Sequence, residues 1–122
     1  MVIRHLSDQP TFITKDGSHI REILNTSNAP VRNQSLADAK VDAGCSTERH
    51  YHKLSEEFYF ILSGSGVMEV DGITKTIGQG DAVLIPVGSS HRITAMEDIH
   101  FLCCCAPPYT HDDTYFQELE RK

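Results

Sequence analysis

Residues 44–64 read GCSTERHYHKLSEEFYFILSG, and this stretch decides how the chain is interpreted. His50 and His52 are separated by one residue, so on a strand their side chains project from the same face. Glu57 follows five residues after His52, at the start of the apolar run 58–62. We expect a hairpin between these two segments, which would bring the carboxylate beside the two imidazoles.

A third histidine follows a second stretch that is punctuated by glycine. Residues 80–91 read GDAVLIPVGSSH and end on His91. Three imidazoles and one carboxylate form a mixed nitrogen and oxygen donor set. Such a set suits iron, manganese, nickel, zinc, cobalt or copper, and leaves one or two coordination positions for water or substrate. We therefore expect one divalent transition metal, whose identity the donor set leaves open. His5, His19 and His111 are interpreted as surface or core residues.

Short apolar runs separated by glycine and proline turns predict a β protein. Asp71-Gly72, between two alternating runs, is the strongest hairpin signal. Many short strands with such turns indicate a sandwich or barrel. Thr110 to Asp113 could cap a short helix over residues 115–119. The expected strands span residues 11–14, 19–24, 35–41, 58–62, 67–70, 73–77, 82–85, 91–94 and 99–105.

Length and charge exclude several classes of protein. A chain of 122 residues has room for one compact domain, and 17 acidic against 11 basic residues give a net charge of −6. A nucleic-acid-binding protein would carry a basic stripe, so we expect no nucleic-acid partner. No apolar run approaches the roughly 18 residues of a membrane span, and residues 1–16 lack the layout of a signal peptide. We expect a soluble cytoplasmic protein without a membrane partner.

The four cysteines lie at position 45 and at positions 103–105. Three in a row suit neither a disulfide framework nor a CxxC zinc site. On a strand, Cys103 and Cys105 would share one face and Cys104 would take the other. We interpret them as small buried thiols in a reducing compartment, with a reactive or metal-bound thiol as the alternative.

The spacing of the two stretches carries the interpretation further. The first has the pattern G-x5-H-x-H-x4-E-x6-G between Gly44 and Gly64. The second has the pattern G-x5-P-x-G-x2-H between Gly80 and His91. These patterns, separated by 15 residues, resemble the two motifs of the cupin superfamily. The second departs from its motif at Ala95, where cupins often have an asparagine that is not a metal ligand.

The resemblance implies an all-β fold, the double-stranded β-helix or jelly-roll barrel, with a short C-terminal helix or rim segment. It also implies a single cupin domain over residues 1–122, with its motifs at 44–64 and 80–95. The metal would lie near the wider mouth of the barrel. Its ligands, carried over position by position, would be His50, His52, Glu57 and His91.

Alternation along residues 56–62 predicts which side chains face the barrel interior. The inward face would carry Glu57, Tyr59 and Ile61, so Glu56 would be solvated. The outward face would carry Phe58, Phe60 and Leu62. A soluble monomer rarely exposes an apolar patch of this kind. We therefore expect a homodimer that buries this face, or alternatively an N-terminal segment, around Phe12 and Ile13, that covers it within one chain.

Residues outside the motifs carry further expectations. His100 would assist the metal as a hydrogen-bond donor or base only if its side chain points inward, and otherwise packs or faces solvent. Arg49 and Arg92 adjoin inward histidines in sequence and should face outward. Residues 107–109 and 111–113 would fold over one end of the barrel as a rim.

A metal held by three histidines and a glutamate supports several chemistries, and the fold does not choose among them. We expect an enzyme that acts on a small oxygenated metabolite, either as an oxygenase or as a sugar or keto-acid isomerase. The isomerase interpretation rests on similarity to small stand-alone cupins. The alternative is a metal-containing cupin that binds or senses a small ligand without turnover. A structural or storage barrel is disfavoured because the donor set is complete. A mostly apolar cavity with few polar anchors would suit a compact ligand of low charge.

Overall fold

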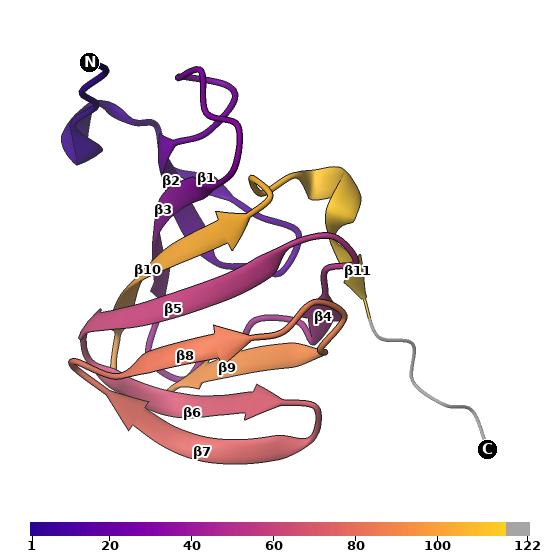
Figure 1. Cartoon of the computed structure of the whole chain (residues 1–122). Coiled ribbons are helices and arrows are strands. Elements are labelled where there is room, and N and C mark those ends of the chain that lie inside the picture. Colours follow the sequence, from indigo (N-terminus) through magenta and orange to yellow (C-terminus); the bar gives the residue numbers. More distant parts are fainter. Residues whose placement is uncertain (117–122) are drawn as a thin grey trace.

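The computed structural model describes residues 1–116 and contains two antiparallel sheets that face each other as a jelly-roll barrel (Figure 1). One sheet has the strand order β1-β2-β3-β10-β5-β8, and the other has the order β11-β4-β9-β6-β7. The strands are β1 (Phe12–Ile13), β2 (His19–Leu24), β3 (Ser35–Val41), β4 (His50–Tyr51), β5 (Glu56–Ser63), β6 (Ser65–Val70), β7 (Ile73–Gly78), β8 (Ala82–Ile85), β9 (His91–Ala95), β10 (Ile99–Ala106) and β11 (Tyr115–Phe116). Two 3-10 turns, η1 (Leu6–Asp8) and η2 (His111–Asp113), complete the described elements. The all-β jelly-roll prediction is confirmed.

The core fills the space between the sheets with side chains that alternate along each strand. On β10, Phe101, Cys103 and Cys105 are buried and point inward, whereas Leu102 and Cys104 point outward. The predicted division of the three cysteines between two faces is therefore confirmed. The largest fully buried side chains are Phe101, Ile61, Ile85, Ile93, Ile99 and His91.

Two turns follow directly from the residues that form them. Asp71 and Gly72 have positive φ angles of 50° and 81°, and they join β6 to β7 as the predicted hairpin. Gly64 ends the first motif between β5 and β6 with φ of 83°. A Cβ atom there would lie 2.0 Å from the carbonyl oxygen of Asp98, so only glycine fits this position.

The predicted C-terminal helix is wrong in the part of the chain that the structure describes. Residues 111–113 form a single 3-10 turn, and Tyr115 and Phe116 then extend as β11. β11 pairs with β4, with Tyr115 opposite Tyr51 and their rings stacked at 5.5 Å. The edge of β4 satisfies backbone groups that a helix would have satisfied internally. Residues 117–119 of the expected helix lie outside the described residues. Among residues 1–116, no helix has the length and hydropathy needed to cross a membrane.

The expected hairpin between the His-x-His segment and Glu57 is also wrong. β4 pairs with β9 and β11 in one sheet, whereas β5 pairs with β10 and β8 in the other. The chain crosses between the sheets at residues 53–55, whose backbone N–H groups donate to the carboxylate of Asp113. The carboxylate of Glu57 therefore approaches the histidines from across the barrel.

The outward face of β5 is apolar and uncovered in the described chain. Phe58 and Phe60 are 51% and 45% exposed. The N-terminal alternative fails because β1 lies at the far edge of that sheet, with β2, β3 and β10 between it and β5. Phe12 packs against the core there, and Ile13 is exposed. The homodimer stays a prediction.

Candidate metal centre

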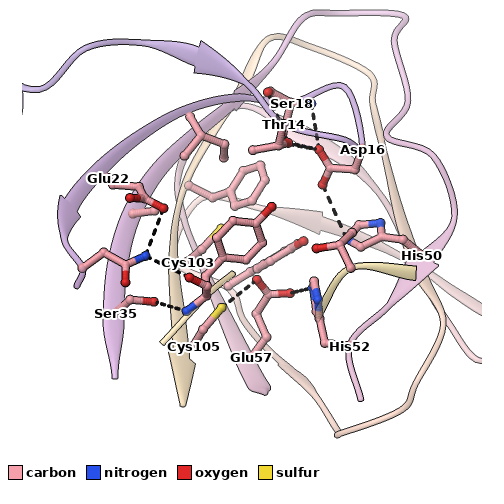
Figure 2. A pocket seen from close by; sticks show the side chains of 17 residues that line it. Thr14, Asp16, Ser18, Glu22, Ser35, His50, His52, Glu57, Cys103 and Cys105 are labelled. Atoms are coloured by element: carbon pink, nitrogen blue, oxygen red, sulfur yellow. Dashed lines mark hydrogen bonds and ion pairs between the residues drawn. The ribbon is translucent and has the colours of Figure 1, made fainter. Parts of the chain in front are cut away.

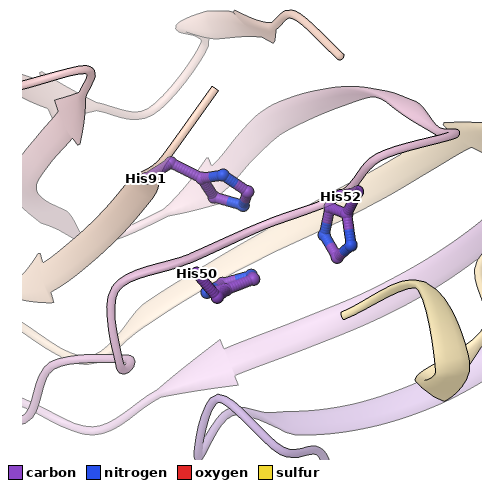
Figure 3. A group of neighbouring side chains, drawn as sticks. All are labelled: His50, His52 and His91. Atoms are coloured by element: carbon purple, nitrogen blue, oxygen red, sulfur yellow. The ribbon is translucent and has the colours of Figure 1, made fainter. Parts of the chain in front are cut away.

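Three histidines from one sheet converge on a single point (Figure 3). His50 lies on β4 directly opposite His91, the first residue of β9, and His52 follows β4. Opposite residues of an antiparallel pair point to the same face, and so do residues two apart on an extended chain. All three side chains are buried, and one ring nitrogen of each lies within 4.8 Å of the others. These histidines are positioned to hold a metal ion.

The second nitrogen of each ring fixes the orientation of the first. Nδ1 of His50 lies 2.7 Å from the carbonyl oxygen of Glu48, and Nδ1 of His91 lies 3.0 Å from that of Ser89. Nδ1 of His52 lies 3.0 Å from the carbonyl oxygen of Asp113. A carbonyl oxygen only accepts, so each Nδ1 carries the proton and donates. Each Nε2 is then an unprotonated donor atom, which is the state that metal binding requires.

Glu57 brings a carboxylate to the same point from the opposite sheet. Its Oε1 lies 3.2 Å from Nε2 of His91 and 3.6 Å from Nε2 of His52. Within the described residues, Glu57 Oε1 and His91 Nε2 are buried without a hydrogen-bond partner. Two lone pairs that face each other in a buried site repel unless a cation lies between them, so the residues present fit a metal ion. Glu56 is exposed, which confirms that Glu57 is the inward carboxylate.

The protonation states of His50 and Glu57 agree with this geometry. Burial, together with the neighbouring His91, lowers the pKa of His50 to about 4. Burial alone would raise the pKa of Glu57, but the neighbouring imidazoles of His52 and His91 hold it well below its usual range. Burial alone would lower the pKa of His52, but Glu57 and the backbone of Asp113 raise it overall. Glu57 is therefore ionised and His50 neutral at physiological pH, as metal ligands must be.

The cysteines and His100 do not join the converging groups. Sγ of Cys105 donates to Oε2 of Glu57 at 3.2 Å, and burial raises the pKa of this thiol far above its usual range. Cys105 therefore orients the carboxylate as a neutral thiol. His100 points outward from β10 and pairs with Asp38. Arg49 pairs with Glu69 outside the barrel core, as the outward prediction for this residue required.

A cavity of about 40 Å³, room for a few water molecules, opens beside His50 and His52 (Figure 2). Phe101 and Tyr59 form part of its apolar wall. Its polar wall is richer than the expected few anchors, and it includes Thr14, Asp16, Ser18, Glu22, Asn25, Ser35, Tyr109 and Thr114. None of these residues belongs to a motif, so the sequence patterns missed them. The predicted rim does contribute, through Tyr109, and Thr114 lines the cavity directly after η2.

Asp16 is a missed residue that approaches a histidine directly. It occupies the turn between β1 and β2, and its Oδ2 lies 3.5 Å from Nε2 of His50. Its Oδ1 accepts hydrogen bonds from the backbone N–H and hydroxyl of Ser18, at 2.9 and 2.7 Å, and from the hydroxyl of Thr14. The dipeptide Asp16-Gly17 repeats the turn signal of Asp71-Gly72 and could have pointed to a tight turn here.

Comparison with known proteins assigns the chain to a family. Residues 38–105 match the cupin domain. The chain is 42% identical to the uncharacterized protein MJ1618 of Methanocaldococcus jannaschii over 88% of this chain and 87% of that one. It is 36% identical to the oxalate-binding protein of Thermotoga maritima over 55% of this chain and 57% of that one. In fold it resembles a Streptomyces PAC13 variant with uridine, with a TM-score of 0.81 and 13% identity, over 97% of this chain and 92% of that one. The protein is a member of the cupin superfamily.

Proposed function

We propose that this cupin is a metal-dependent enzyme that acts on a small oxygenated metabolite. His50, His52, His91 and Glu57 would hold one divalent transition metal. The observation that carries this proposal is the buried, unpartnered pair formed by Oε1 of Glu57 and Nε2 of His91, 3.2 Å apart. A bound cation would remove their repulsion and would give each buried group a partner.

Such a metal, when bound, would polarise an oxygen of the substrate or lower the pKa of a bound water. The residues that line the cavity would position the substrate and set the polarity of its surroundings. One wall of the cavity is kept apolar by Phe101, Tyr59 and the two inward thiols of β10. Tyr109 adds a third aromatic ring, whose centroid lies 6.0 Å from that of the His52 ring. Asp16 provides a hydrogen-bond acceptor beside His50. The small cavity favours a compact substrate.

Two reaction types fit the proposed metal centre. An oxygenase and a sugar or keto-acid isomerase would both rely on a metal that binds substrate oxygens. The three histidines and Glu57 could hold such a metal for either reaction. The second candidate function is binding without turnover. It is favoured by the similarity to a protein named for oxalate binding.

Metal content tests the proposal. Protein purified without an affinity tag should contain close to one transition metal per chain by elemental mass spectrometry. The double variant His50→Ala with His52→Ala should lose that metal and still form the barrel, since the core lies elsewhere. The matched control, His5→Ala with His19→Ala, removes two histidines that lie away from the site and should keep it. Equal metal content in the wild type and in the double variant would refute the ligand assignment.

We further propose a cytoplasmic homodimer. The four cysteines are free thiols, which a reducing compartment favours. The exposed face of β5, with Phe58 and Phe60 beside Leu84 of β8, has the apolar character of a surface that a second copy would cover.

A further inference from the structure

The cavity beside the candidate metal centre has an unusual balance of charge. Three carboxylates line it, those of Asp16, Glu22 and Glu57. No lysine or arginine among residues 1–116 lines the same cavity. Proteins recognise carboxylate ligands mainly through arginine or lysine, so a dicarboxylate would meet no cationic side chain of the described chain here.

Asp16 and Glu22 differ in what their oxygens already bind. Oε1 of Glu22 accepts from the amide of Asn25 at 3.0 Å, and Oε2 accepts from the hydroxyl of Ser27 at 3.2 Å. Both oxygens of Glu22 therefore serve the loop that follows β2.

Asp16 is anchored on one side only. Ser18 and Thr14 hold its Oδ1, which fixes the direction of the carboxylate. Its Oδ2 faces Nε2 of His50 at 3.5 Å, and this nitrogen has no proton to donate because Nδ1 carries it. Oδ2 is thus a preoriented acceptor in the cavity wall beside His50.

We infer, resting on the proposed function, that Asp16 selects a neutral, hydroxyl-bearing ligand over a dicarboxylate. A neutral polyol or hydroxyketone would place its oxygens at the metal and donate a hydroxyl hydrogen to Oδ2 of Asp16. A dicarboxylate has no hydrogen to donate and would bring two like charges to the same carboxylate. Removing one charge a few ångströms from a dianion in a partly buried site changes its affinity by about tenfold or more.

The test uses the full chain loaded with cobalt(II) and two probes, oxalate and dihydroxyacetone. Calorimetry and the visible cobalt bands give both dissociation constants. In Asp16→Asn, the affinity for oxalate relative to dihydroxyacetone should rise at least about tenfold. Asp16→Glu keeps the charge and should keep oxalate weak. The control Asp42→Asn removes an exposed carboxylate outside the cavity and should leave the ratio unchanged.

The outcomes separate the inference from the proposed function. A wild-type chain that takes up no cobalt overturns the proposed function before any ligand is added. A loaded chain whose affinity ratio is the same in the wild type and Asp16→Asn overturns the inference alone. Preference of the loaded wild type for oxalate over dihydroxyacetone overturns it as well. Asp16→Glu supplies an independent result if Asp16→Asn fails to fold, because an affinity ratio about tenfold above the wild-type ratio in that variant would contradict exclusion by charge.

Discussion

The carboxylate of Asp113 should be the main tie between the rim and the candidate metal centre. Asp113 is 5% exposed. Its Oδ1 accepts from the backbone N–H of Lys53 at 3.0 Å, and its Oδ2 accepts from that of Ser55 at 3.2 Å, with the N–H of Leu54 shared between the two oxygens. These three residues form the crossing from β4 to β5, which sets the position of both His52 and Glu57.

The substitution Asp113→Ala removes all three contacts at once. A hydrogen bond to a charged group contributes about 1.5–3 kcal/mol to stability. Lys53 and Leu54 are exposed, so water can replace the acceptor at their N–H groups, whereas Ser55 is buried. Counting the buried contact in full and discounting the other two gives a loss of about 3 kcal/mol. For a chain of this length, such a loss corresponds to a fall in Tm of about 10 °C.

Thermal melting followed by circular dichroism measures this effect. Asp112→Ala is the matched control, because Asp112 lies in the same 3-10 turn and its side chain is exposed. The metal affinity of Asp113→Ala should also fall, by about tenfold, since the partner that orients His52 moves with the rim. Equal melting temperatures for the two variants would refute the role assigned to this carboxylate.

Three further predictions concern titration, assembly and thiol reactivity. The pKa of His50 is lowered from 6.5 to about 4 in the folded chain. As the pH falls below 6.5, the unfolded chain therefore binds a proton that the folded chain does not bind, and the metal-free protein loses stability. His50→Gln should remove close to one proton from that slope in denaturation measurements, and an unchanged slope would contradict the assignment. Phe60→Glu should turn a dimer into a monomer by light scattering, whereas an unchanged mass would remove the argument from the apolar face. Iodoacetamide should label exposed Cys45 first. Burial raises the pKa values of Cys103 and Cys105, so these thiols should react only after unfolding. Early labelling of these two cysteines, measured by peptide mass spectrometry, would count against the packing of β10.

Local sequence was sufficient where a strand's own pattern determined its limits. The bounds predicted for residues 19–24, 35–41 and 82–85 are those observed for β2, β3 and β8, because turn residues stop each run on both sides. β4 and β11 have two residues each and no period to detect. Their extended form comes from pairing with each other and with β9, so only the folded barrel determines it.

The residues of the candidate site also fall into those that the sequence predicted and those that only the fold brings in. Motif spacing and strand parity predicted that His50, His52, His91 and Glu57 would meet, and the structure brings them together. The predicted local structure was wrong. A hairpin was expected to bring Glu57 beside His50 and His52, whereas the carboxylate and the histidines come from opposite sheets. Asp16 could not be found by either argument, because its approach to His50 depends on where the β1–β2 turn lies against the barrel mouth.

The cross-sheet origin of the site has a thermodynamic consequence. Glu57 belongs to the six-stranded sheet, and His50 and His91 belong to the five-stranded sheet. A metal bound by all three would therefore link the sheets, and it would bind the closed barrel but not an open one. Under that condition, ligand at 100 times its Kd adds about 2.7 kcal/mol of stability, similar to the contribution worked out for Asp113. The rim and the metal would thus stabilise the same end of the barrel, and loosening either should weaken the other.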